Sequence, residues 1–137
     1  MRTAVDTNVI SALWSGEPLA QSVAGVLSDA KMEGGLVIAA SVYAELLAYP
    51  SATESFLNSF LQETSVSVDF EFNQSIWLEA GRRFARYAKR RRKSSAGGPR
   101  RLLVDFVIGA HALAQADRLM TLDPNQYKRD FPELRLI

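Results

Sequence analysis

The chain has 137 residues, of which 47% are hydrophobic, and its 16 Lys and Arg residues nearly balance its 15 Asp and Glu residues. This length predicts a single domain over residues 1–137 with enough apolar side chains for a core, which excludes a disordered chain. The absence of Cys and the presence of one His exclude disulfides, cysteine nucleophiles and metal sites built from thiolates or several histidines.

Short apolar runs alternate with helical patterns along the chain. The expected elements are a strand over 2–5, a helix over 19–33, a strand over 36–39, helices over 42–49 and 53–62, a strand over 65–70, helices over 71–92 and 103–116, and strands over 118–122 and 134–137. Ser41 is expected to cap helix 42–49, and Pro50 to stop it. Residues 94–99 are expected to form a loop. The order predicts an α/β protein, a three-layer α/β/α domain with a mostly parallel central sheet.

The sequence shows no membrane segment. No apolar run approaches the ~20 residues that span a bilayer, and the polar residues near the N-terminus do not fit a signal peptide. We therefore expect a cytoplasmic protein that does not enter a membrane.

Four acidic residues occupy places where the negative charge of a carboxylate must be balanced by a proton or a cation. Asp6 and Asp123 follow apolar runs, at the expected carboxyl ends of buried strands, where open α/β sheets bind ligands. Glu45 and Asp105 lie within apolar helical patterns. Two carboxylates about 5 Å apart repel by about 3 kcal/mol at a dielectric near 20, so four converging groups require protons or a cation. All-oxygen ligation favours Mg²⁺, Mn²⁺ or Ca²⁺, and such an ion can activate water against a phosphodiester.

Each acid also has an ordinary structural interpretation. Asp6 can be the N-cap of the helix that follows it, Asp105 can pair with Arg101 one turn earlier, and Asp123 before a proline is a common turn opening. Glu45 has no Lys or Arg at helical neighbour spacing, so an exposed ion pair explains it poorly. Taken together, the four favour a metal site.

Residues 82–101 hold ten of the sixteen Lys and Arg residues and no acidic residue. Such a concentration is typical of a polyanion-binding surface, and we favour the backbone of RNA over a solvated helix face or a protein contact. The residues expected to bind nucleic acid are Arg82, Arg86, Lys89, Arg90, Arg91, Arg92, Lys93, Arg100 and Arg101. The single histidine, His111, lies among apolar residues and is expected to pack in the core.

The segments that carry the acids resemble those of a PIN domain. They are VDTNVI at 5–10, SVYAEL at 41–46, VDFVIGAHA at 104–112 and LMTLD at 119–123. The resemblance covers essentially the whole chain and is close to the VapC type, the ribonuclease toxins of bacterial and archaeal toxin–antitoxin pairs. It implies a PIN-like fold and a Mg²⁺- or Mn²⁺-dependent endoribonuclease.

The resemblance also implies roles for individual residues and partners. The acids that would hold metal and carry catalysis are Asp6, Glu45, Asp105 and Asp123, with Asn8 and Thr121 orienting them through hydrogen bonds. The implied partners are an RNA substrate, a small antitoxin protein and a second copy in a homodimer.

Other functions remain as alternatives. A stand-alone RNA-processing PIN nuclease fits the same motifs, and a non-catalytic RNA-binding module could use the acids for a structural cation. A phosphatase of the haloacid dehalogenase type is disfavoured because it needs an Asp where Asn8 stands. A response-regulator receiver domain is disfavoured because it needs a further early acid and a late lysine.

Overall fold

The structure is a computed structural model that describes residues 1–94 and 102–137. The expectations for Arg100 and Arg101, and for most of the loop at 94–99, lie outside these residues. The elements are β1 (Thr3–Val5), α1 (Thr7–Ser15), α2 (Leu19–Gly34), β2 (Leu36–Ala39), α3 (Ala40–Leu46), α4 (Glu54–Thr64), β3 (Val66–Asp69), α5 (Gln74–Lys93), α6 (Leu103–Gln115), β4 (Arg118–Met120) and α7 (Pro124–Lys128).

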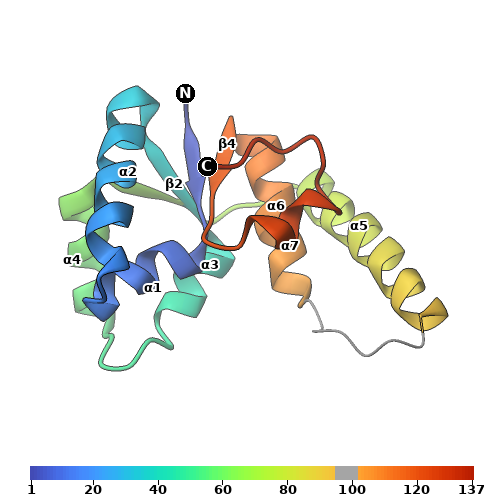
Figure 1. Ribbon diagram of the computed structural model, residues 1–137, viewed down its shortest axis with the longest axis horizontal. Coiled ribbons are helices and arrows are strands. Elements are labelled where there is room, and N and C mark those ends of the chain that lie inside the picture. The colour runs from blue at the N-terminus through green and yellow to red at the C-terminus, as the bar shows by residue number, and fades with distance from the viewer. Residues whose placement is uncertain (95–101) are drawn as a thin grey trace.

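The four strands form one parallel sheet in the order β3-β2-β1-β4. Helices α2 and α4 lie on one side of this sheet and α5 and α6 on the other (Figure 1). All residues of β1, β2 and β4 are buried, and most of them are apolar. This is expected of a parallel sheet that is covered on both faces. The predicted three-layer α/β/α fold with a parallel sheet is confirmed.

The C-terminal segment closes the core against α6. Tyr127 and Phe131 are fully buried, and Phe131 lies so close to Gly109 of α6 that a Cβ there would be 2.5 Å from the ring. The tail then runs beside β4, where Leu119 bridges Leu136 in parallel. The strand expected over 134–137 is thus one isolated bridge rather than a regular strand.

Two local expectations were wrong. The helix expected over 42–49 begins at Ala40 and ends at Leu46, because the chain passes directly from β2 into α3 and turns well before Pro50. The residue at the N-cap is therefore Ala39, and Ser41 lies inside the helix with its buried hydroxyl unpartnered. Over residues 1–94 and 102–137, no helix combines the length and hydropathy that a membrane crossing requires.

Candidate active site

The site lies at the carboxyl ends of two neighbouring strands. Asp6 follows β1 and Thr121 follows β4, and the backbone N–H of Asp6 donates to the carbonyl of Met120 at 2.9 Å. The chain runs outward from β1 through β2 to β3 and then returns to the other side of β1. The crevice between β1 and β4 is therefore the topological switch point, where open α/β sheets bind ligands.

Asp6 is buried, with a relative exposure of 5%. Its Oδ1 accepts from the backbone N–H of Thr7 at 2.8 Å, so Asp6 also caps α1. Its Oδ2 accepts from the hydroxyls of Thr121 and Tyr127, both at 2.9 Å. Burial raises the pKa of Asp6, these three hydrogen bonds oppose the rise, and the negative charge of Asp105 adds to it. The carboxylate is held in place, but its charge is only partly compensated.

Thr7 connects Asp6 to a second acid. Its backbone N–H binds Asp6, and its hydroxyl donates to Oε1 of Glu45, on α3, at 2.7 Å. Asp105 enters from a third element, the first turn of α6, where its Oδ2 accepts from the backbone N–H of Leu102 at 3.2 Å. Glu45 and Asp105 are both half-buried. Three acids that are distant in sequence therefore approach one another from the N-cap of α1, the last turn of α3 and the first turn of α6.

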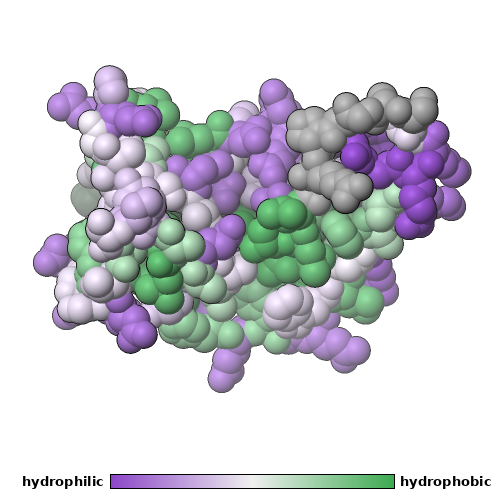
Figure 2. Space-filling model, turned by 90° about the horizontal axis from the view of Figure 1, so that it is seen from below, coloured by the Kyte–Doolittle hydropathy of each residue, from purple (hydrophilic) through white to green (hydrophobic). Residues whose placement is uncertain are grey.

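These acids line one open cleft of about 580 Å³. Four carboxylates border it, those of Asp6, Glu17, Glu45 and Asp105, and within the described part of the chain no Lys or Arg does so. Figure 2 shows this end of the molecule from below, and hydrophilic side chains lie near the middle of the face. The cleft is thus a concentration of negative charge open to solvent.

Asp123 and Asn8 lie at the edge of this arrangement. Asp123 is exposed and does not border the cleft, and its backbone N–H donates to the Thr121 hydroxyl at 3.1 Å. Asn8 borders the cleft and accepts from the N–H of Leu122 at 3.2 Å, while its amide lies 3.5 Å from the Thr121 hydroxyl. Asn8 therefore fixes the chain after β4 relative to α1.

The donor set suits a hard cation, although not as a closed cage. Across residues 1–94 and 102–137, no three His, Asp or Glu side chains are grouped closely enough to hold an ion by themselves. Mg²⁺ usually keeps several waters and is bound through one or two carboxylates together with substrate phosphates. A carboxylate offers about four lone-pair sites, and Asp6 uses three of them. An open cleft bordered by carboxylates fits that mode of binding.

Comparison with known proteins identifies the family. The model of the PIN domain matches residues 3–132. This chain belongs to the PIN domain family. By sequence, no curated protein matches it significantly.

Solved structures share the fold of this PIN domain. VapBC2 from Rickettsia felis, bound to a DNA fragment from their promoter, is 21% identical with a TM-score of 0.69, over 100% of this chain and 98% of that one. VapBC-1 from nontypeable Haemophilus influenzae is 22% identical with a TM-score of 0.66, over 100% and 97%. FitAcB from Neisseria gonorrhoeae is 18% identical with a TM-score of 0.66, over 98% and 96%. At these identities the likeness is one of fold.

Sequence reasoning missed several residues of the PIN domain site. Tyr127 reaches Asp6 from α7, and Thr7 links Asp6 to Glu45. Glu17 adds a fourth carboxylate to the cleft. Thr7 is flagged by its place directly after Asp6, whereas Tyr127 stands among polar residues with no local signal, since its role comes from a contact over 121 residues.

The basic tract divides into residues engaged in the fold and residues on the surface. Arg83 is buried, donates to Glu79 at 2.7 Å and to the carbonyl of Asp130 at 2.8 Å, and pairs with Glu133. Arg90 pairs with Asp130. Among the residues of the tract that the structure describes, those with exposed side chains are Arg82, Arg86, Lys89, Arg92 and Lys93.

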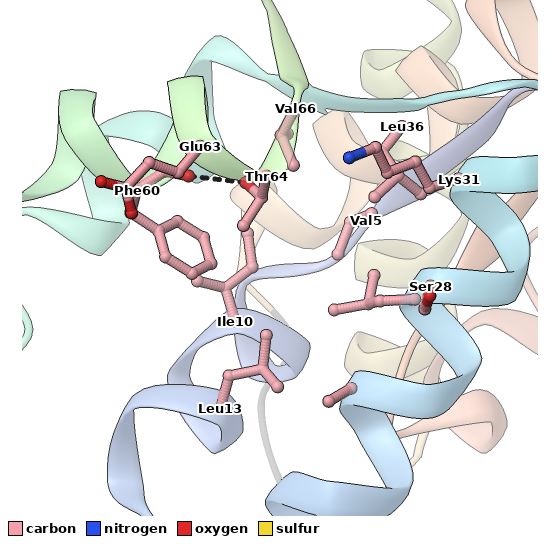
Figure 3. Close-up of a pocket in the computed structure, with 12 residues that line it drawn as sticks. Val5, Ile10, Leu13, Ser28, Lys31, Leu36, Phe60, Glu63, Thr64 and Val66 are labelled. Carbon is pink, nitrogen blue, oxygen red and sulfur yellow. Dashed lines mark hydrogen bonds between the residues drawn. The ribbon is translucent and has the colours of Figure 1, made fainter.

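Two further features of this PIN domain lie away from the cleft. His111 is fully buried, contacts Asp69 at 2.8 Å and stacks on Phe72, and burial lowers its pKa, so its predicted place in the core is confirmed. An apolar hollow of about 280 Å³ lies between α2 and α4, where Leu13, Phe60 and Val66 are among its lining residues (Figure 3). It contains no paired acids and is separate from the candidate site.

Proposed function

We propose that this PIN domain is a metal-dependent endoribonuclease that uses Mg²⁺ or Mn²⁺ to hydrolyse phosphodiester bonds in RNA. The observation that supports this most strongly is the convergence of Asp6, Glu45 and Asp105 on one cleft. Four carboxylates border this cleft, and no Lys or Arg among the described residues does so. Such a cleft repels RNA unless metal ions neutralise it. Together with membership of the PIN family, this favours phosphodiester chemistry.

The residues proposed to hold the ion are Asp6, Glu45 and Asp105. Asp123 joins them in the sequence prediction, and because it is exposed outside the cleft, its contribution requires movement of the turn before α7. When bound, a divalent ion lowers the pKa of water and stabilises the oxygens of an in-line displacement. No covalent intermediate with a side chain is needed.

Other residues of the chain orient these acids. Thr121 and Tyr127 fix one oxygen of Asp6, and Thr7 fixes both Asp6 and Glu45. This arrangement keeps Asp6 in one rotamer, which reduces the reorganisation needed when an ion or phosphate arrives. The exposed cations of α5 would hold the phosphates of the substrate outside the acidic cleft.

Cleavage assays with an Asp105→Asn variant test the proposal. The wild type should cleave RNA in Mg²⁺ or Mn²⁺ and not in EDTA, and Asp105→Asn should abolish cleavage while its thermal melt stays close to that of the wild type. Asp29→Asn is a matched control, because Asp29 is an exposed acid of α2 outside the cleft. Full activity of Asp105→Asn would remove Asp105 from the mechanism.

A non-catalytic RNA-binding module with a structural cation is the second candidate. It is favoured by the absence, over the described residues, of three acids grouped closely enough to hold an ion. This module would bind RNA and leave it intact in Mg²⁺ and Mn²⁺. Intact RNA at enzyme concentrations that saturate binding would select it over the nuclease.

We further propose that the protein is the toxin of a VapBC-type pair, acts in the cytoplasm, and forms a homodimer with a small antitoxin as inhibitor. The support is the shared fold with the VapBC structures over essentially the full length of both chains. A stand-alone RNA-processing nuclease is the alternative. Growth arrest on expression, relieved by a small protein encoded next to this one, would support the toxin, and light scattering would give the oligomeric state.

A further inference from the structure

Two adjoining hollows between α5 and the α7 segment lead away from the acidic cleft. They measure about 180 and 140 Å³ and share Arg90, Arg129 and Asp130. We call them together the arginine groove. Gln126 borders both the acidic cleft and the nearer hollow of the arginine groove. The cleft and the groove are therefore consecutive parts of one surface.

The charge reverses between these two parts. Among the described residues, four carboxylates and no cation border the cleft, whereas five arginines and two acids border the arginine groove. Metal ions in the cleft would neutralise the phosphate that is cleaved. The neighbouring phosphates of the same strand need fixed cations instead. The arginines of the groove, on the other side of Gln126 from the cleft, are such cations.

The arginines of the groove differ in how far they are already neutralised. Arg83 pairs with Glu79 and Glu133, and Arg90 pairs with Asp130. Arg129 is exposed and, among the described residues, has no acidic oxygen within ion-pair distance. Its backbone is helical, and it follows Gln126 by three residues, so the two side chains lie on the same side of the segment.

Beyond the groove, the exposed cations of α5 continue the path. Arg86 borders the farther hollow. At about 100° per residue, Arg82, Arg86, Lys89 and Lys93 fall within an arc of about 60° along about 16 Å of helix, which makes one stripe. Figure 2 shows the dense hydrophilic end of the molecule that this helix forms.

We propose that single-stranded RNA runs from the acidic cleft over Gln126 into the arginine groove, where Arg129 binds the backbone phosphate nearest the cleavage site, and then along the stripe on α5. This inference depends on the proposed function, which supplies RNA as the substrate, and it adds Gln126 and Arg129 as positioning residues. The charge tract of the sequence flags neither residue, because they lie 25 and 28 residues beyond its end at residue 101.

The test compares Arg129→Gln with Lys128→Gln. Lys128 is the neighbouring exposed cation and borders neither the cleft nor the groove. The probes are fluorescent oligoribonucleotides of increasing length, measured by anisotropy in EDTA so that no cleavage occurs. Arg129→Gln should bind the longer oligonucleotides about fivefold more weakly, as for the loss of one exposed charge pair. It should also lower the salt slope by about 0.7.

The pattern across variants and lengths decides the outcome. Lys128→Gln should bind like the wild type. The shortest oligonucleotides, which reach only the cleft, should bind weakly in EDTA and to the same extent to the wild type and to Arg129→Gln. If the wild type cleaves RNA in Mg²⁺ while both variants bind alike at every length, the groove is not on the RNA path and the proposed function stands. If the wild type neither binds nor cleaves RNA, the proposed function fails together with this inference.

Discussion

Replacement of Gly109 by Ala tests how the C-terminal segment is held against α6. An added Cβ would lie 2.5, 2.6 and 2.9 Å from three carbons of the Phe131 ring. Phe131 is fully buried, packs against Phe106 and Tyr127, and has the Arg83 guanidinium 4.6 Å from its ring centroid. The ring cannot retreat without moving the segment that supplies Tyr127 to Asp6.

A second glycine provides the matched control. Gly81 lies in the interior of α5 and an added Cβ there would meet nothing within 4 Å. In either helix, Gly→Ala gains about 1 kcal/mol of helix propensity. The difference in the free energy of unfolding between the two variants therefore isolates the steric cost at Gly109. Overpacking of a buried site typically costs about 1–3 kcal/mol. For a chain of this size that corresponds to roughly 4–12 °C in melting temperature.

Thermal melts followed by circular dichroism, with urea titrations as a second measure, give this difference directly. We expect Gly81→Ala to melt above the wild type and Gly109→Ala to melt well below Gly81→Ala. A Gly109→Ala protein as stable as Gly81→Ala would refute the close packing of α6 on Phe131. It would also mean that the contact of Phe131 with α6 does not set the position of Tyr127.

Three further substitutions test the site and its support. Folding raises the pKa of Asp6, so the free energy of unfolding should fall as pH rises above about 4. The total fall is ~1.4 kcal/mol for each unit by which the pKa in the folded chain exceeds that in the unfolded chain. Asp6→Asn should remove this loss, so its stability relative to the wild type should grow with pH in urea titrations from pH 4 to 7; a constant difference would contradict the assignment. Tyr127→Phe deletes a hydrogen bond to the Asp6 carboxylate and should cost about 1–2 kcal/mol at pH 7, and less where Asp6 is protonated, as measured by the same titrations. Arg83→Met removes the hydrogen bond to the Asp130 carbonyl and the contact over Phe131; a loss of about 2–3 kcal/mol is expected from melts, and a loss under 0.5 kcal/mol would make the ion pairs incidental.

The fold and the centre of the site were predictable because their signals are local. Each buried strand is a short apolar run, and Asp6 stands directly after one of them, so the parallel sheet and the place of this acid follow from the sequence. Glu45 and Asp105 stood out because they interrupt apolar helical patterns. The structure brings both to the cleft that Asp6 borders.

The remaining features depend on contacts between distant segments. Tyr127 is a site residue only because Phe131 anchors the C-terminal segment on α6, and the sequence around it is polar. Arg83 reads as one cation of a tract, yet packing against Glu133 and Phe131 makes it part of the core. Asp123 follows an apolar run as Asp6 does, but the turn into α7 leaves it exposed outside the cleft. No local pattern distinguishes these cases.

The uncompensated acids of the cleft have a practical consequence for finding ligands. Burial of the charged Asp6 carboxylate lowers the stability of the folded chain. A cation that binds in the cleft should therefore stabilise the fold. Binding to the folded chain raises its melting temperature in proportion to the logarithm of ligand concentration. Thermal stability alone could therefore rank divalent cations and cationic inhibitors, with Asp6→Asn as the reference that should respond least.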